Sequence, residues 1–298
     1  MNGGIELRHL RYFLAVESEL SFTRAAASLG LAQPNLSEQI RQLEVRVGTL
    51  LFQRTKRRVE PTAAGRAFGA EARRTLAQAD HAVEAARLAA AGRSGVVRVG
   101  FVESAGIRFL PPLLGMFART HPSVEVSLHQ LSTAQQVARL ERGELDVGFM
   151  TQVLGTDFRS RPVARERINV VLPAGHELAE RDAVPLRMLD GQTLLFRTRD
   201  VAPAAFDAVM AAFREAGVVP RLVLHPVGAS MLQGLVAHGA GLTLASEAHS
   251  TRRDLAVVYR PLVEPELHSD LYAVWTGDEP APATAEFLAA ATAARPDS

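Results

Sequence analysis

The spacing of apolar residues divides the chain into two regions. Over roughly the first ninety residues the spacing is helical, apart from a short interruption after Gly48. From Val96 onward, short apolar runs alternate with amphipathic segments, a pattern typical of an α/β fold with parallel sheets covered by helices. The strands predicted there are Val96–Phe101, Val124–Leu128, Leu145–Met150, Ile168–Leu172, Thr193–Phe196, Arg221–Leu224, Leu242–Ala245, Leu255–Tyr259 and Leu271–Trp275. The helices predicted between them are Ile107–Arg119, Ala134–Arg142, Pro203–Ala216 and Ser230–Ala237.

The first region begins with three short helices. The apolar period predicts a helix over 5–18 and another from Phe22 to Leu29, with Ser21 as its N-cap and Gly30 as its left-handed end. Pro34 fits the first turn of a third helix, where its missing N–H is not needed. The residues that define its buried stripe and its end are Leu36, Ile40, Leu43, Val47 and Gly48.

The outer face of this third helix carries amides, hydroxyls and a guanidinium. Two helices joined by a tight turn, the later one with a buried stripe and a polar N-terminal end, predict a helix-turn-helix. The later helix would lie in the major groove of DNA, where amide side chains pair with adenine. The alternative is a small helical domain with a solvated face. The candidate DNA-contacting residues are Ser21, Thr23, Gln33, Pro34, Asn35, Ser37, Glu38, Arg41, Arg54, Lys56 and Arg57.

A cation-rich segment follows this helix and adds charge to the same region. The stretch LLFQRTKRRVEPTAAG predicts a short β-hairpin or loop, which could contact phosphates or a minor groove. Residues 1–66 hold ten basic and six acidic side chains, whereas the whole chain of 298 residues holds 33 and 32. A basic head on a slightly acidic body indicates that the head binds a polyanion.

An alanine-rich helix is predicted from Thr62 to about Ala91. Its apolar positions step by three and four residues, close to a heptad seam, which favours a dimerising linker helix. The alternative is a helix packed on its own domain. The seam residues are Phe68, Ala72, Leu76, Ala79, Val83, Ala86 and Ala90. Gly92-Arg93-Ser94-Gly95 then breaks the helix and marks a domain boundary.

Composition excludes several classes of protein. The chain has no cysteine, so thiolate metal sites, disulfides and cysteine nucleophiles are excluded. The sequence shows no zinc-protease motif, Walker loop or nucleophile elbow, and we expect no metal or cofactor. No apolar run reaches the ~18 residues of a membrane span, and the N-terminus does not resemble a signal peptide, so the expected location is the cytoplasm.

The first 65 residues resemble the LysR-type transcriptional regulators without gaps. The stretch that carries the resemblance is LRHLRYFLAVESELSFTRAAASLGLAQPNLSEQIRQLEVRVGTLLFQRTKRRVEPTAAG. The resemblance implies a winged helix-turn-helix over 1–62, a linker helix over 63–92 and an effector-binding domain over 93–298. Lobe I of that periplasmic-binding-protein-like domain would span about 93–167 and 269–298, and lobe II about 168–268.

Two strand ends in the second region predict a ligand site. Ser104 and Ala105 follow one predicted strand, and Ser132 and Thr133 follow its neighbour, each where a helix begins. Ligands of open α/β sheets bind at the carboxyl ends of strands, and helix N-termini favour a carboxylate. The alternative is plain helix capping, because Ser132 with Gln135, and Thr133 with Gln136, have the capping-box spacing.

The second region resembles the branch of the family that senses muconate-like intermediates of aromatic degradation. The stretch concerned is VRVGFVESAGIRFLPPLLGMFARTHPSVEVSLHQLSTAQQVARLERGELDVGFM. In that branch the residues matching Ser104 and Thr133 hold an effector carboxylate. The resemblance also implies contributions from Thr151 and from the segment Arg197 to Phe206, with Pro203 and Phe206 as candidates.

Three residues depart from the family pattern. Ala32 stands where the family often has a Ser or Thr cap, Glu38 where many members have a non-acidic residue, and Thr151 where muconate-responding relatives often have Arg. The predicted function is transcriptional regulation, as an activator. The chain is not expected to be an enzyme. Its expected partners are double-stranded DNA, a muconate- or benzoate-like carboxylate, RNA polymerase and copies of itself in a homodimer or homotetramer. The alternatives are a constitutive DNA-binding protein whose body only oligomerises, and an enzyme or solute binder with a DNA-binding head.

Overall fold

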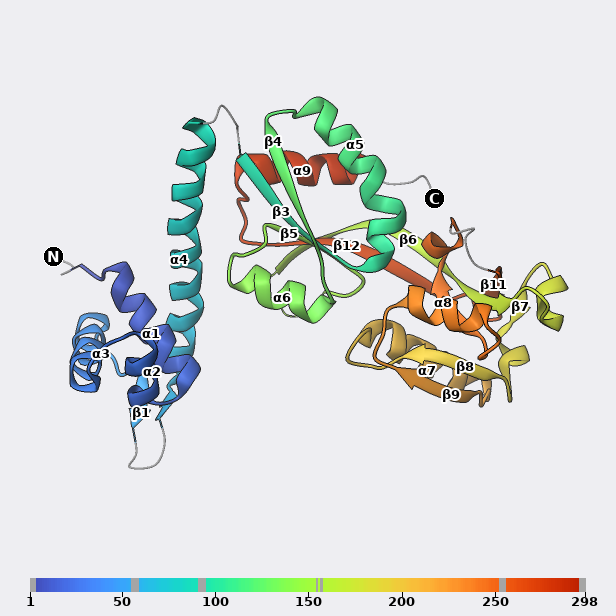
Figure 1. Ribbon diagram of the computed structural model, residues 1–298, viewed down its shortest axis with the longest axis horizontal. Coiled ribbons are helices and arrows are strands. Elements are labelled where there is room, and N and C mark those ends of the chain that lie inside the picture. Colours follow the sequence, from blue (N-terminus) through green and yellow to red (C-terminus); the bar gives the residue numbers. More distant parts are fainter. Residues whose placement is uncertain are drawn as a thin grey trace. The chain divides into compact units, whose positions relative to one another are not determined.

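The computed structural model divides the chain into two compact units (Figure 1). It describes residues 4–54, 59–90, 95–153, 155, 158–251 and 256–294. The first unit comprises Met1–Gly92 with Glu141–Glu144, and the second comprises Arg93–Leu140 with Leu145–Ser298. Across the described residues, no helix combines the length and the apolar character that crossing a membrane requires.

The first unit is helical with one small hairpin. Its elements are α1 (Leu7–Glu19), α2 (Phe22–Ser28), α3 (Gln33–Val47), β1 (Phe52–Arg54), β2 (Val59–Pro61) and α4 (Ala63–Ala90). The predicted punctuation of these helices is confirmed. The Ser21 hydroxyl accepts the Arg24 N–H at 3.4 Å, Gly30 and Gly48 have φ of 67° and 81°, and Pro34 lies in the first turn of α3.

The buried stripe of α3 holds the unit together. Leu36, Ile40 and Leu43 have no exposed surface, and they lie in one core with Phe13 of α1 and Phe52 of β1. The rings of Phe13 and Phe52 are stacked with their centroids 4.8 Å apart. This core fixes the orientation of the outer face of α3, because a close-packed interior allows little rotation of the helix.

A buried carboxylate joins α3 to the hairpin. Glu44 is 7% exposed, and its Oε1 accepts the backbone N–H of Leu51 at 2.9 Å and of Phe52 at 3.1 Å. Two backbone donors that enter β1 are thereby satisfied inside the core. The sequence pattern did not identify this role, because Glu44 looks like one more polar residue beside the apolar stripe.

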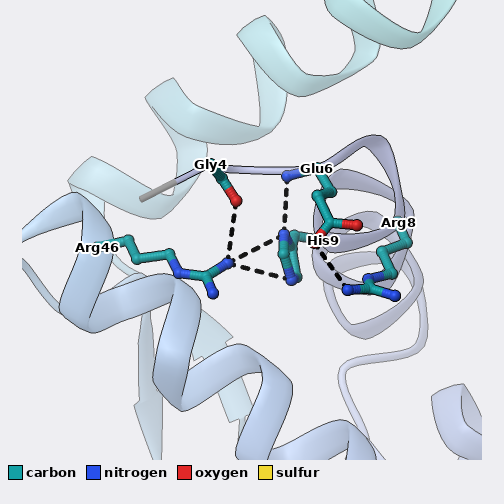
Figure 2. Close-up of polar contacts among 5 residues, drawn as sticks. All are labelled: Gly4, Glu6, Arg8, His9 and Arg46. Carbon is teal, nitrogen blue, oxygen red and sulfur yellow. Dashed lines mark hydrogen bonds and ion pairs between the residues drawn. The ribbon is translucent and has the colours of Figure 1, made fainter. Parts of the chain in front are cut away.

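A second polar cluster joins α1 to the last turn of α3 (Figure 2). His9 is 2% exposed, and its Nδ1 accepts the Glu6 backbone N–H at 2.9 Å. The Arg46 guanidinium lies 3.3 Å from His9 Nε2 and donates to the Gly4 carbonyl at 3.2 Å, while Arg8 pairs with Glu6 at 2.7 Å. Burial, and then the charge of Arg46, lower the pKa of His9 below its ordinary value. The neutral imidazole therefore serves as the acceptor that closes the first turn of α1.

The start of α4 packs within its own unit. The ring of Phe68 meets that of Phe13 edge to face with centroids 5.0 Å apart, and Ala72 is buried. The first two residues of the predicted heptad seam therefore cover the head rather than a partner helix. Further along, Val83 is 52% exposed, so its side chain is accessible to a partner helix.

The second unit is an α/β structure built on an eight-stranded sheet. Its strands are β3 (Gly95–Phe101), β4 (Val124–Gln130), β5 (Val147–Met150), β6 (Phe158–Pro173), β7 (Val184–Pro185), β8 (Thr193–Arg197), β9 (Arg221–His225), β10 (Thr243–Ser246), β11 (Val257–Val263) and β12 (His268–Thr276). The order is β4-β3-β5-β12-β6-β11-β7, with β10 also paired to β6, and β8 and β9 form a separate parallel pair.

Helices cover these strands. They are the π-helical turn η1 (Ala105–Phe109), α5 (Leu110–Thr120), α6 (Thr133–Glu141), α7 (Pro203–Ala216), α8 (Ala229–Ala237) and α9 (Pro282–Ala293), with 3₁₀ turns η2 (Glu177–Glu180), η3 (Leu186–Leu189) and η4 (Glu247–Thr251). Helices α5 and α9 lie side by side (Figure 1), where the rings of Phe117 and Phe287 meet at 5.0 Å. The sequence pattern missed α9, because its alanine-rich composition has little amphipathic period.

The prediction of parallel sheets is wrong at the centre of this unit. β4, β3 and β5 are parallel, but β12 runs antiparallel to both β5 and β6. The sequence pattern predicted only the apolar second half of β6. The first half, over 158–167, contains several exposed arginines and so lacks a continuous apolar run. The full strand has 16 residues, and a strand that long can belong to two halves of a domain at once.

Strand β6 passes from one hydrophobic core to another. Its residues Phe158–Arg167 pair with β12, whereas Ile168–Pro173 pair with β10 and β11. The first core gathers Val97, Phe149 and Phe287, and the second gathers residues of β8, α7 and β10 around Phe196. We call the half that contains the first core lobe I and the half that contains the second core lobe II. The two strands β6 and β12 thus connect the lobes.

Candidate functional site

The polar face of α3 is exposed at its N-terminal end. Gln33, Pro34 and Asn35 are exposed, and Ser37 and Glu38 are half-buried, on the side opposite the apolar stripe. The structure therefore presents amide and hydroxyl groups from a helix that its core holds in place. This is the arrangement by which a recognition helix offers its first turns to base edges in the major groove.

Arg41 is engaged with an acidic neighbour on the same helix. Its Nε and Nη2 donate to the two Glu38 carboxylate oxygens at 2.8 and 2.7 Å, and Gln42 donates to the same carboxylate at 3.0 Å. The hydrogen bonds from Arg41 and Gln42 lower the pKa of Glu38 to about 2. Arg41 keeps further N–H donors for a DNA phosphate, but the charge of Glu38 offsets part of its attraction to that phosphate.

The remaining head residues lie in different settings. The N-cap of α3 is Ala32, which has no side-chain hydrogen bond, so the cap hydroxyl that is common in the family is not replaced. Thr23 is exposed on α2, and the Ser21 hydroxyl serves as a helix cap. Arg54 ends β1, while Lys56, Arg57 and Arg58 lie outside the described residues.

Between the lobes of the second unit lies a cavity of about 400 Å³. Lobe I lines it with the residues that follow β3 and β4, and lobe II lines it with the ends of β8 and β10 and the first turns of α7 and α8. The two strands that connect the lobes, β6 and β12, also contribute residues to the wall. A pocket of this size between two lobes suits a small organic molecule.

Of the three predicted hydroxyl residues that follow β3 and β4, Ser132 differs from Ser104 and Thr133. Ser132 forms a capping box, because its N–H donates to Gln135 Oε1 at 3.0 Å and its Oγ accepts the Gln135 N–H at 3.3 Å. Ser104 and Thr133 line the cavity, and neither hydroxyl makes a hydrogen bond to the residues that the structure describes. Capping therefore accounts for Ser132 but leaves the other two hydroxyls for a ligand.

The other predicted residues divide between the cavity wall and the cores. Thr151 lines the cavity. Ala105 is 1% exposed in the core of lobe I, in the first turn of η1. Phe206 packs against the core of lobe II, with its ring 6.3 Å from that of Phe196. Pro203 begins α7, but its neighbours Ala202 and Ala204, rather than Pro203 itself, line the cavity.

Among the described residues that line the cavity, three carry a carboxylate or a guanidinium: Arg197, which begins the predicted segment Arg197 to Phe206, and Glu103 and Asp270, which were not among the predicted site residues. Arg197 is the last residue of β8, and Glu103 follows β3 in lobe I. The Glu103 carboxylate accepts the Ala229 N–H at the start of α8 in lobe II at 3.0 Å. Burial lowers the pKa of Arg197, and the charge of Glu103 opposes that effect. The sequence signal available for Arg197 and Glu103 was their place at a strand end, the same signal that selected Ser104.

A half-buried acid, Glu166, lies where η4 meets β6. Burial raises the pKa of Glu166, while a hydrogen bond with Ser246 and the charge of Arg108 act in the opposite direction. Ser246 also lies 3.3 Å from His249 Nδ1, and both residues line the cavity. The cavity wall thus includes polar groups where the two lobes join.

A head that presents a recognition helix, together with a two-lobed α/β unit that encloses a ligand-sized cavity, defines a ligand-responsive DNA-binding regulator. Comparison with known families agrees. Residues 7–66 match the model described as bacterial regulatory helix-turn-helix protein, lysR family, and residues 90–295 match the LysR substrate binding domain. The chain belongs to the LysR family of transcriptional regulators and has a DNA-binding head and an effector-binding domain.

Individual relatives cover nearly the whole chain. The chain is 32% identical over 285 residues to the HTH-type transcriptional regulator AlsR of Bacillus subtilis, a match that covers 95% of this chain and 94% of AlsR. It is 36% identical to the Hca operon transcriptional activator HcaR of Escherichia coli, with 96% of each covered. The solved structure of full-length CbnR in complex with its target DNA covers 98% of this chain and all of CbnR, at a TM-score of 0.60 and 26% identity.

Proposed function

We propose that this chain is a transcriptional activator switched by a small carboxylate that binds between its lobes. The single observation that carries the proposal is the pair of cavity hydroxyls, Ser104 and Thr133, that no described residue engages. They lie where two neighbouring parallel strands end and helices begin, the place where a carboxylate finds backbone N–H donors. A muconate- or benzoate-like molecule fits a cavity of about 400 Å³.

The head would bind promoter DNA through the predicted contact residues of α2, α3 and the hairpin. The activator role is supported by HcaR, whose name describes an operon activator, and DNA contact by the solved CbnR complex. Binding of the carboxylate would bias the relation between the lobes, and a ligand can shift such an equilibrium only by its differential affinity for the two states. RNA polymerase is the partner through which an activator acts.

The domain limits and the assembly belong to the same proposal. The head would span 1–62, the linker helix 63–92 and the effector domain 93–298. The lobes would divide near residues 167 and 268, where β6 and β12 pass from one lobe to the other. The linker helices would pair two copies, and two such pairs would form a tetramer. The protein would act in the cytoplasm without catalytic activity or a cofactor. The alternative of a body that only oligomerises is less favoured, since such a body has no use for a polar cavity.

DNA binding should weaken steeply with salt. If two heads together neutralise about six phosphates, log K for a duplex of random sequence should fall with log salt at a slope near −5, because each contact releases condensed counterions. Titration of labelled duplex by fluorescence anisotropy at several salt concentrations gives the slope. Lys56→Ala should flatten it by about 1 for each phosphate that the lysine neutralises, whereas Asn35→Ala should leave it nearly unchanged. An affinity that does not depend on salt would contradict the proposal for the head.

Removing either cavity hydroxyl should weaken carboxylate binding. Ser104→Ala and Thr133→Ala should each cost about 1–3 kcal/mol of binding free energy, the range for a hydrogen bond to a charged group. Calorimetric titration with muconate and benzoate measures the effect, and Thr133→Ser is the matched control because it keeps the hydroxyl. Binding to duplex DNA without ligand should not change. If both alanine variants bind carboxylate as tightly as the original protein, the carboxylate does not bind at these hydroxyls.

A further inference from the structure

The cavity wall contains a half-buried guanidinium that forms no ion pair with any described residue. Among the described residues that line the cavity, Arg197 is the only arginine or lysine. Its Nε is shielded from solvent and has no hydrogen-bond partner, and no described residue forms an ion pair with it. The nearest ring, that of Phe196, lies 5.9 Å from the guanidinium carbon and offers only a weak cation–π contact. A desolvated charge in this state destabilises the protein, unless something outside the described residues pairs with it.

A second unused donor lies beside the guanidinium. The Thr198 hydroxyl is shielded from solvent and makes no hydrogen bond to the described residues. Arg197 and Thr198 are consecutive at the carboxyl end of β8, the edge of a parallel strand pair at which ligands bind. Native proteins leave few buried polar groups unsatisfied, so two such donors side by side at one strand end call for an explanation.

The negative charge that acts on Arg197 comes from the other lobe. Glu103 acts on Arg197 through its charge, but no ion pair forms between them. Its carboxylate instead accepts the Ala229 N–H at 3.0 Å and lies against Gly228, where an added Cβ would come within 2.9 Å of Glu103 Oε2. Glu103 therefore places an anion of lobe I at the positive N-terminal end of α8 in lobe II. It partly offsets the charge of Arg197 across the cavity.

We propose that Arg197 is the charge partner of the effector and that Glu103 is the internal anion against which the effector competes. The inference rests on the proposed function, because it assumes that the cavity binds the effector. The ligand is a small organic anion with a planar carboxylate, since a guanidinium fork pairs with such a group through two parallel hydrogen bonds. A ligand held by Arg197 in lobe II and by the hydroxyls of lobe I would join the lobes directly, replacing the link that Glu103 provides.

The two variants should have opposite effects. Arg197→Gln should weaken benzoate binding about 10- to 100-fold, the loss expected for a charge-assisted hydrogen bond, while binding of the neutral isostere benzamide should hardly change. Glu103→Gln keeps an acceptor for the Ala229 N–H but removes the competing charge, so it should strengthen benzoate binding severalfold. Arg197→Lys keeps the charge without the fork and should lie between the original protein and Arg197→Gln.

Thermal shift and calorimetry on the full chain test the proposal with benzoate, muconate and benzamide as probes. Far-ultraviolet circular dichroism checks that each variant is folded, and Arg197→Lys replaces Arg197→Gln if the latter does not fold. If Ser104→Ala and Thr133→Ala weaken carboxylate binding and Arg197→Gln does not, the inference is overturned and the proposed function stands. If only the Arg197 variants weaken it, the inference stands and the role of the hydroxyls fails. If no carboxylate binds, or if Glu103→Gln weakens binding as Arg197→Gln does, the competing-anion scheme is wrong.

Discussion

Glu44→Ala is expected to destabilise the DNA-binding head strongly and to weaken DNA binding. The substitution removes the acceptor of two buried backbone N–H groups, those of Leu51 and Phe52. Each buried donor left without a partner costs about 1–3 kcal/mol, so the loss is about 2–6 kcal/mol against a total stability of about 5–15 kcal/mol for a typical domain. Hydrogen exchange measured by mass spectrometry should show reduced protection across α1, α3 and β1, and anisotropy should show weaker binding to duplex DNA.

Two neighbouring variants make the Glu44 experiment specific. Glu44→Gln keeps an oxygen acceptor in the same place, so it should retain most of the protection and most of the DNA affinity. Val45→Ala changes the next residue of α3, which is 70% exposed, and should leave both unchanged. Protection of peptides from the second unit should be the same in all three variants. An unchanged head in Glu44→Ala would mean that the hairpin does not depend on this carboxylate.

Val83→Glu is expected to break the protein into monomers and to reduce its affinity for a two-site operator by about 100-fold or more. The side chain is 52% exposed in the single chain, as a seam residue awaiting a partner would be. In a paired linker helix, two carboxylates would face each other in an apolar seam, and an unpaired buried charge costs several kcal/mol. Loss of pairing also removes the high effective concentration of the second head, on which avidity depends.

Sedimentation velocity and operator titration together test the seam. An operator can be selected from random duplexes with the original protein and then used for both measurements. Gln78→Glu is the matched control, because it adds the same charge to the exposed side of α4, outside the predicted seam. The control should keep the mass and the affinity of the original protein. A Val83→Glu protein of unchanged mass that still binds the operator tightly would show that the copies pair elsewhere.

Much of the head could be predicted because its determinants are local. The Ser21 cap, the left-handed Gly30 and Gly48, and Pro34 act within one turn of chain, and the structure has them as predicted. The apolar stripe of α3 depends only on the helical period. Glu44 escaped prediction since its function requires the N–H groups of β1, which reach it only when the hairpin folds back.

The sequence by itself determined the order of the elements, the helix-turn-helix and the strand ends at which a ligand site could form. Tertiary structure alone decided the antiparallel pairing of β6 and β12, because register depends on pairing between distant segments. This pairing of the two connecting strands places residues of both lobes around one cavity, where Glu103 of lobe I accepts a hydrogen bond from the start of α8 in lobe II. It also separates Ser104 and Thr133, which line the cavity, from Ala105 and Phe206, which pack in the cores. A local pattern places a residue at a strand end, but only the packing of the lobes decides whether its side chain lines the cavity.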